Sequence, residues 1–287
     1  MLIKRFFKYY RPHMPLFLLD FSCAFAMAGL DLVFPLAVQW IIDRVLPQQD
    51  LTLFYWICAG LLVLYLLRAF LQYIVDYWGH VLGVRIEYDM RQDMFEHIQK
   101  LSFRYFDNTK TGHIMSRLVN DLNEISELAH HGPEDLFIAT VTLIGSFVIM
   151  LTIHWQLALL IFPVVPVMIW FAVSKNKIMQ QAFRDVRLKV ADINARVEDS
   201  ISGVRVVKSF TNEWYEKEKF EQDNRNFRTS KQRSYRAMAE FFSGFNFFSN
   251  LINLIVLFFG GYMIYRGQIT LGILVGFLLY VNLFLQP

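Results

Sequence analysis

The fold is decided by residues 198–223, which read EDSISGVRVVKSFTNEWYEKEKFEQD, and by the charged segment around them. This segment runs from about residue 174 to residue 240 and lies between two hydrophobic stretches. It lacks the glycine- and proline-rich texture of loops, so we expect two long helices that leave the membrane, turn once and return. A second segment of this kind covers residues 73–135. A membrane protein needs such arms when a partner outside the bilayer must push or pull on its spans.

Hydrophobic residues make up 55% of the 287 residues and aromatic residues 16%, which places the chain in the membrane class. Most of the hydrophobic stretches come close to the ~20 apolar residues that a helix needs to cross about 30 Å of hydrocarbon. The sequence therefore predicts an all-α membrane protein with six transmembrane helices and long cytoplasmic extensions. The expected spans cover about residues 14–42, 53–72, 136–153, 157–173, 241–265 and 271–287. The net charge of +3 follows from this topology and does not indicate nucleic-acid binding.

The distribution of lysine and arginine sets the orientation of these spans. The first thirteen residues and the two arms, 73–135 and 174–240, together hold 25 of the 28 basic residues. On the opposite side there are only Arg44 and Arg266. We therefore expect both termini and both arms to be cytoplasmic, in an inner or plasma membrane.

Residues 1–11 have the pattern of a short helix that lies in the headgroup plane. Apolar and basic side chains occupy different faces of this helix: Leu2, Phe6, Phe7 and Tyr10 against Lys4, Arg5, Lys8 and Arg11. A basic flank without such a helix explains the same residues nearly as well.

Each arm has a tip at which the helical pattern breaks. At the first tip, Asp107 is a natural N-cap for a short transverse helix, and Gly112 permits a turn of the backbone into the returning helix. At the second tip, Phe210 places an aromatic side chain at the apex, with the cap-type residue Thr211 beside it. We expect the functional residues of each arm to lie at its tip.

Three stretches resemble one family in the right order and spacing. Residues 105–121 (YFDNTKTGHIMSRLVND) and 198–223 are similar to the two intracellular loops of ATP-binding-cassette (ABC) exporters of the bacterial multidrug and lipid type. Residues 260–280 (GGYMIYRGQITLGILVGFLLY) resemble the junction of that family's fifth and sixth spans. The resemblance implies that residues 1–287 form the six-helix transmembrane domain of such an exporter, in a domain-swapped dimer with a second copy or a paralogous half-transporter.

The resemblance also implies that each tip is a coupling helix seated on a nucleotide-binding domain, the second one on that of the partner subunit. The implied coupling residues are Phe106, Asp107, Asn108, Thr109, Lys110 and Thr111 at the first tip and Phe210, Thr211, Asn212 and Glu213 at the second. The remaining implied partners are membrane lipids and a hydrophobic small-molecule substrate.

No phosphate-binding motif of the form G-x-x-x-x-G-K-[ST] occurs in the chain. We therefore expect no catalytic residue and no cofactor here, with ATP and magnesium held by a nucleotide-binding domain outside this sequence. The last hydrophobic stretch is only about 25 Å long as a helix, less than the bilayer core. We interpret the chain as a transmembrane domain cut from a longer polypeptide that hydrolyses ATP.

Three charged residues, Asp20, Asp31 and Arg68, lie within the spans, where an internal ion pair is the commonest role. Counted from the outer ends of their helices, Asp31 and Arg68 lie at depths of about 17 and 24 Å, within reach of an arginine side chain. The sequence favours structural pairing of these two over contact with a substrate. Asp20 is the alternative partner for Arg68.

The fifth span carries a polar face. Asn246, Asn250 and Asn253 fall at i, i+4 and i+7, beside an aromatic stripe that includes Phe245 and Phe248. One interpretation is the wall of a partly wet substrate cavity. The other is hydrogen bonding between helices, and the two have similar weight until the exporter resemblance favours the cavity slightly.

The pair His130 and His131 has no further ligands at metal spacing, so we expect a solvated helix face and no metal site.

The leading functional hypothesis is the permease half of an ATP-driven exporter of hydrophobic or amphipathic compounds, such as drugs or lipids, by alternating access. A peptide exporter of the same family is the first alternative. A stand-alone membrane scaffold that docks a cytosolic partner is the second.

Overall fold

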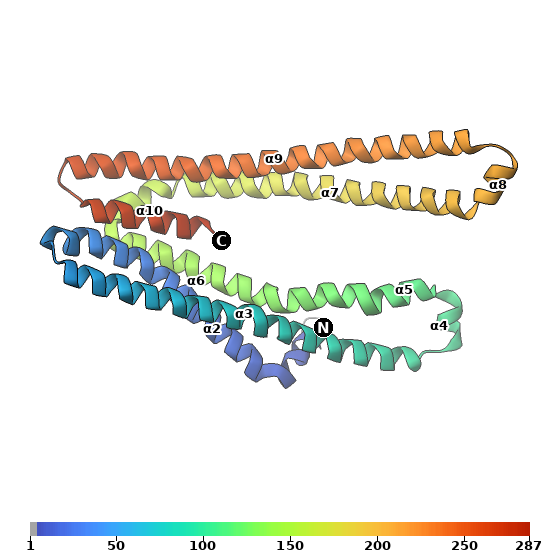
Figure 1. The fold of residues 1–287 in the computed structure, drawn as a ribbon, viewed down its shortest axis with the longest axis horizontal. Coiled ribbons are helices and arrows are strands. Elements are labelled where there is room, and N and C mark those ends of the chain that lie inside the picture. Colours follow the sequence, from blue (N-terminus) through green and yellow to red (C-terminus); the bar gives the residue numbers. More distant parts are fainter. Residues whose placement is uncertain (1–4) are drawn as a thin grey trace. The chain divides into compact units, whose positions relative to one another are not determined.

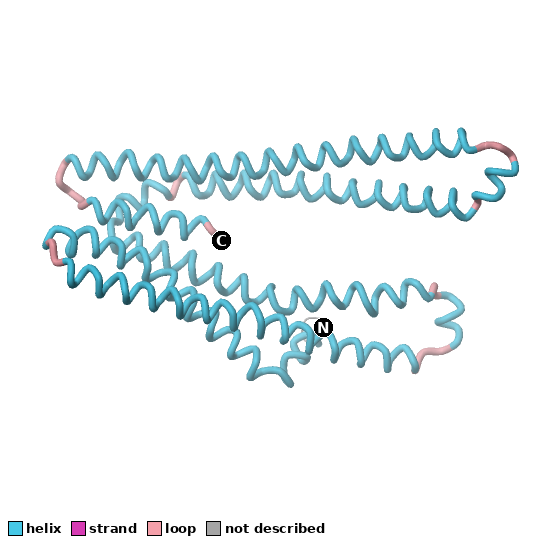
Figure 2. Tube along the Cα trace, in the orientation of Figure 1, coloured by secondary structure: helices cyan, strands magenta, loops and turns pink. Residues whose placement is uncertain are grey.

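The computed structural model describes residues 5–287, and within that range the chain consists of helices joined by short turns, with no strand (Figures 1 and 2). The α-helices are α2 (Met14–Trp40), α3 (Leu51–Gln99), α4 (Phe103–Asn108), α5 (Thr111–Ser116), α6 (Leu122–Ile161), α7 (Val164–Ser202), α8 (Val204–Ser209), α9 (Glu213–Tyr265) and α10 (Leu271–Leu285). Short 3-10 or π-helical turns are η1 (Phe7–His13), η2 (Ile41–Val45), η3 (Leu46–Gln48) and η4 (Arg117–Asp121). The all-α class is therefore confirmed.

Within residues 5–287, four helical stretches are long and apolar enough to cross a membrane: Phe7–Gln48, Leu51–Gln99, Thr111–Ile161 and Glu213–Tyr265. The helix Leu271–Leu285 is also apolar but shorter. By length and composition, the chain is an integral membrane protein. These helices do not establish six spans, so that number stays a prediction.

The described chain divides into two compact units. Unit 1 comprises Met1–Leu157 together with Phe259–Pro287, and unit 2 comprises Ala158–Phe258. Each unit contains one of the two predicted arms.

In unit 1, α2 and α3 form an antiparallel hairpin (Figure 1). The turn between them uses a left-handed backbone at Gln49, where φ is 54°. Asp50 then caps α3, because its Oδ1 accepts a hydrogen bond from the Leu53 amide at 2.9 Å. With 49 residues, α3 is about 74 Å long, far more than the hydrocarbon of a bilayer, so it supplies both a span and the outgoing leg of the first arm.

The N-terminal segment is fastened to the base of this arm. Tyr10 is buried, and its hydroxyl donates a hydrogen bond to the Ala129 carbonyl at 2.6 Å. The Tyr9 hydroxyl donates to Asp93 of α3 at 2.8 Å. Of the residues predicted to form an interfacial helix, Leu2 and Lys4 lie outside the described residues.

Helix α10 packs closely against α2 through small residues. A Cβ on Gly272 would lie 2.5 Å from the Asp43 side chain, and a Cβ on Gly276 would lie 3.1 Å from Gln39. One turn further along, the buried Tyr280 donates its hydroxyl to the Leu32 carbonyl. Glycine at two successive turns therefore lets α10 approach α2 at backbone distance.

The start of α10 is fixed by the same contact. The Asp43 carboxylate accepts hydrogen bonds from the Thr270 hydroxyl at 2.6 Å and from the Gly272 amide at 2.9 Å. Thr270 is also the N-cap of α10 and accepts from the Ile273 amide. A carboxylate at a helix N-terminus satisfies free amides and complements the helix dipole.

The first tip has a short helix, but not where the sequence places it. Helix α4 begins three residues before Phe106, and Ser102 is its N-cap. Asp107 lies in the last turn of α4, so its prediction as an N-cap is wrong. Gly112 lies inside α5 without a positive φ, so the turn does not depend on it, and the bend is made at Thr109, whose backbone is extended.

In unit 2, α7 and α9 form the two legs of the second arm. Polar contacts join them at three levels: Lys175 with Glu240 at 2.8 Å, Arg196 with Asp223 at 3.0 Å, and Ser200 with Glu216 at 2.7 Å. The hydrogen bond from the Ser200 hydroxyl, more than any other effect, lowers the pKa of the Glu216 carboxyl. These contacts hold the legs in one register along the arm.

The second tip also differs from its prediction in position. The short helix is α8, which ends at Ser209, so Phe210 follows it instead of opening it. Thr211 adopts a left-handed backbone with φ of 52°, which is uncommon for a β-branched residue. Helix α9 then begins at Glu213.

The predicted break between the third and fourth spans is present as a kink. α6 has a non-helical backbone at His154, with φ of −159° and ψ of 96°. It continues to Ile161, and α7 starts after Pro163. The chain therefore turns over more residues than the three that the sequence suggests.

Candidate functional site: a charged cavity and two exposed tips

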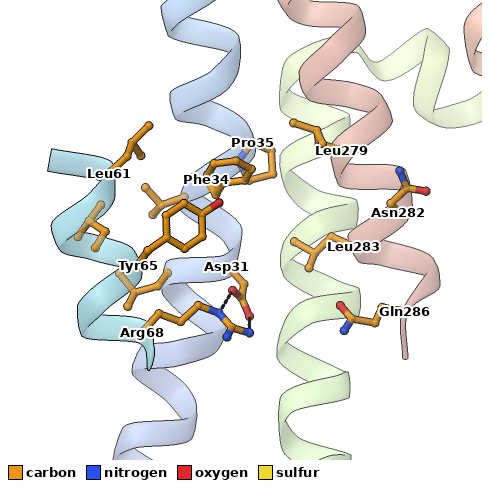
Figure 3. Close-up of a pocket in the computed structure, with 13 residues that line it drawn as sticks. Asp31, Phe34, Pro35, Leu61, Tyr65, Arg68, Leu279, Asn282, Leu283 and Gln286 are labelled. Atoms are coloured by element: carbon orange, nitrogen blue, oxygen red, sulfur yellow. Dashed lines mark hydrogen bonds and ion pairs between the residues drawn. The ribbon is translucent and has the colours of Figure 1, made fainter. Parts of the chain in front are cut away.

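A cavity of about 420 Å³ lies between α2, α3 and α10 of unit 1 (Figure 3). Its wall is mostly aliphatic and aromatic, with a few polar groups. The lining residues are Leu30, Asp31, Val33, Phe34, Pro35, Leu61, Leu64, Tyr65, Arg68, Leu279, Asn282, Leu283 and Gln286. The volume lies within the range of small-molecule sites, which are typically apolar with a few placed polar groups.

The structure brings Asp31 and Arg68 together in the wall of this cavity. Arg68 Nε donates to Asp31 Oδ1 at 2.5 Å, and Nη2 donates to Oδ2 at 2.9 Å. This two-point contact is the strong form of a charge-assisted hydrogen bond. Asp20, the alternative partner, instead lies beside His130.

Aromatic and amide groups complete the wall. The rings of Phe34 and Tyr65 lie 5.3 Å apart at 59° on α2 and α3 (Figure 3). Across the cavity lie Asn282 of α10 and Gln286, which directly follows that helix. Such a wall accepts a ligand that is apolar over most of its surface and carries a polar or charged group.

Sequence reasoning missed the contribution of α10 to this site. Asn282 in α10 and Gln286 directly after it carry amide side chains in an otherwise apolar stretch, and their i, i+4 spacing was the signal that could have found them. The sequence alone does not show that they line the same cavity as Asp31, since some 250 residues separate α2 from α10 in the chain.

The five residues predicted for a substrate cavity lie on α9 in unit 2, and none of them lines the cavity in unit 1. Asn246 and Asn250 are exposed, and Asn253 is half-buried. Phe248 contacts Phe171 of α7, with ring centroids 5.3 Å apart, and Phe245 lies 6.3 Å from the ring of Phe241. Their role in substrate binding stays a prediction.

Both tips expose large apolar side chains. Phe103 is 89% exposed at the start of α4, and Phe210 is 78% exposed after α8. Phe106 is also exposed, and Val206 of α8 adds an apolar surface next to Phe210. Aromatic residues exposed on charged helices are typical anchors for a protein partner.

The expectation of a solvated His130–His131 pair is wrong for His130. His130 is buried, whereas the side chain of His131 is half-exposed. Three ionisable residues from other positions lie beside His130: Asp20, His80 and Glu134.

The sequence matches a protein family over residues 17–287, and the family is described as the ABC transporter transmembrane region. The match covers most of the chain, including the cavity and both tips.

Three relatives illustrate the range of similar proteins. An uncharacterized ABC transporter ATP-binding protein, YwjA of Bacillus subtilis, is 46% identical over 100% of this chain and 50% of its own length. A putative multidrug export ATP-binding/permease protein, YgaD of Bacillus subtilis, is 25% identical over 99% of this chain and 50% of its length. An ATP-dependent lipid A-core flippase of Syntrophus aciditrophicus is 25% identical over 100% of this chain and 48% of its length. The chain thus spans about half the length of the curated relatives it matches.

Proposed function

Since the chain belongs to the family of ABC transporter transmembrane regions, we propose that it is the permease half of an ATP-driven exporter. It moves hydrophobic or amphipathic compounds out of the cytoplasm or the inner leaflet. Two copies, or one copy and a paralogous half, form the pathway, with six spans each and both termini in the cytoplasm.

The cavity in unit 1 supports this proposal most directly. A bidentate ion pair in an apolar and aromatic wall, 420 Å³ in volume, is suited to a molecule with an extended apolar body and a polar group. A cavity lowers the stability of a folded protein, and a scaffold that binds no small molecule has no use for one. Larger side chains at these positions would make such a scaffold more stable.

The substrate class rests on the cavity and on two relatives. One relative carries a name for multidrug export and the other for lipid A-core flipping, and these names describe those proteins. Drugs and lipids of that kind are amphipathic, which agrees with the wall described here. Peptide export finds no specific support in the described residues.

Coupling to ATP is proposed to occur at the tips. Phe103 and Phe106 at the first tip and Phe210 at the second insert into nucleotide-binding domains, which hold ATP and magnesium. In unit 1, α3 is one continuous helix that lines the cavity at Arg68 and ends at Gln99, about 45 Å further along. A displacement of the first tip therefore reaches the cavity through a single rigid element.

A transport assay tests this function. Inside-out vesicles from cells that produce the protein with nucleotide-binding domains are given ATP and a fluorescent amphipathic dye. We expect ATP-dependent accumulation of the dye, and we expect Leu283→Trp to reduce it severalfold because the larger ring occupies the cavity.

The matched control is Leu62→Trp, on an exposed position of α3 that does not line the cavity. It should leave accumulation unchanged. Equal transport by both variants would show that the cavity is not part of the transport pathway. If the unmodified protein accumulated neither dyes nor labelled lipids, the scaffold hypothesis would be favoured.

A further inference from the structure

A cluster of ionisable side chains is buried in unit 1 away from the cavity. Asp20 of α2 is 1% exposed, and His130 and Glu134 of α6 are 4% and 6% exposed. None of the three belongs to the proposed substrate site or to a tip. Buried ionisable groups are costly unless they are paired or bind a cation, so this cluster requires an explanation.

Each member has a buried atom without a hydrogen-bond partner among the described residues. These atoms are Asp20 Oδ1, His130 Nδ1 and Glu134 Oε2. Within residues 5–287, no lysine or arginine forms an ion pair with either carboxylate. Ionised, the two carboxylates would leave two negative charges without compensation, which a divalent cation would neutralise.

The distances fit a metal ion. His130 Nδ1 lies 3.3 Å from Glu134 Oε2 and 3.9 Å from Asp20 Oδ2. One donor atom from each of the three residues lies within 4.8 Å of the others. Ligands at about 2.0–2.2 Å from a tetrahedral zinc ion are about 3.3–3.6 Å apart. The His130–Glu134 pair already fits, the His130–Asp20 pair needs a shift of a few tenths of an ångström, and the Asp20–Glu134 pair lies within 4.8 Å.

The surroundings hold His130 in place. Its ring lies against the backbone of Gly79 in α3, so closely that a Cβ there would be 1.8 Å from His130 Cε1. His80 follows on the same helix, with its ring centroid 4.8 Å from that of His130. His80 Nδ1 lies 2.5 Å from the Asp76 carbonyl, to which it donates a proton, and this leaves Nε2 available as a further donor atom.

We propose that Asp20, His130 and Glu134 bind a divalent transition-metal ion of the zinc class. One imidazole and two carboxylates suit zinc, cobalt or manganese better than calcium, which takes oxygen ligands alone. The ion joins α2 to α6 at the base of the first arm. His80 and His131 form a second donor group with His130, separate from the two carboxylates.

Metal content of the purified protein tests the site. The protein is prepared in detergent without a polyhistidine tag, stripped with a chelator, and dialysed against Zn²⁺ or Co²⁺ at micromolar concentration. We expect one ion per chain by mass spectrometry of the metal, a visible absorption spectrum with Co²⁺, and a higher melting temperature with Zn²⁺ but not with Mg²⁺. Absence of a bound ion in this preparation overturns the proposal.

Isosteric variants identify the ligands. Asp20→Asn and Glu134→Gln keep the shape of the cluster and should each weaken Zn²⁺ binding by at least about tenfold. Asp135→Asn, next to the cluster but exposed, is the matched control and should bind as the unmodified protein does. Unchanged affinity in both isosteric variants, or loss of binding only in a His80→Gln, His131→Gln double variant, would contradict the proposed ligands.

Discussion

Asp31 and Arg68 carry opposite charges on helices that are otherwise apolar, and each lowers the cost of placing the other there. The contact uses both carboxylate oxygens and two guanidinium nitrogens. Because the pair also lines the cavity, it stabilises the helices and is placed to orient a polar group of the proposed substrate.

A double-mutant cycle measures this pairing. Asp31→Ala and Arg68→Ala should each destabilise the protein, since each leaves one charge without its partner. The interaction free energy should be about 0.5–3 kcal/mol, determined from unfolding in detergent. Additive effects of the two substitutions would show that the pair contributes nothing, and Arg68→Lys, which keeps the charge but not the two-point contact, should give an intermediate loss.

Gly79 offers a second test at the scale of one residue. Gly79→Ala should lower the melting temperature, because its Cβ would overlap His130. Gly60→Ala on the same helix is the control: nothing lies within 4 Å of its Cβ, so alanine should be neutral or stabilise by up to about 1 kcal/mol. Equal effects of the two substitutions in a thermal unfolding assay would mean that His130 does not pack there.

Some of these residue-level features could be predicted and others could not. Charges are rare inside spans, so the sequence left few possible partners for Arg68. His130 and Asp20 are 110 positions apart, and a single sequence contains no signal that α2 and α6 bring them together. From the sequence alone, the histidine pair is therefore expected on a solvated face.

At the scale of elements, the long helices of the arms follow from the absence of proline and loop texture, whereas the short helices at the tips lie elsewhere than predicted. Capping preferences allow several starts in a segment rich in serine, threonine, asparagine and aspartate. Ser102 is the N-cap of α4 and Gly203 that of α8, in each case earlier than the expected coupling residues. Although the helices start elsewhere, the aromatic side chains of Phe106 and Phe210 are exposed at the tips.

The second tip gives a prediction for the arm as an element. Phe210→Ala should lower substrate-stimulated ATP hydrolysis by about tenfold in the protein assembled with nucleotide-binding domains, because a buried aromatic anchor contributes about 2 kcal/mol or more to an interface. Tyr235→Ala, an exposed aromatic residue on the same arm but far from the tip, should not. An ATPase rate that responds equally to both substitutions would exclude Phe210 as a docking residue.

At the scale of the whole molecule, the chain consists of two compact units, each with an arm that ends in an exposed apolar tip. The membrane class and the family were readable from the sequence, because hydropathy and loop motifs are local signals. The cavity was not, since it is built from α2, α3 and α10 and depends on the glycine-mediated contact of α10 with α2.

Under the proposed function, nucleotide at the tips changes which side of the membrane the cavity faces. Leu283→Cys places a thiol in the cavity wall, in a protein whose Cys23 and Cys58 have been replaced. Leu62→Cys, exposed on α3 and outside the cavity, is the control and should stay unreactive.

The decisive measurement is the labelling rate of that thiol by a membrane-impermeant reagent, added from each side of sealed vesicles, without nucleotide and with ATP and vanadate trapped. We predict labelling from the cytoplasmic side without nucleotide and from the opposite side in the trapped state. Labelling from the same side and at the same rate in both states would contradict alternating access through this cavity.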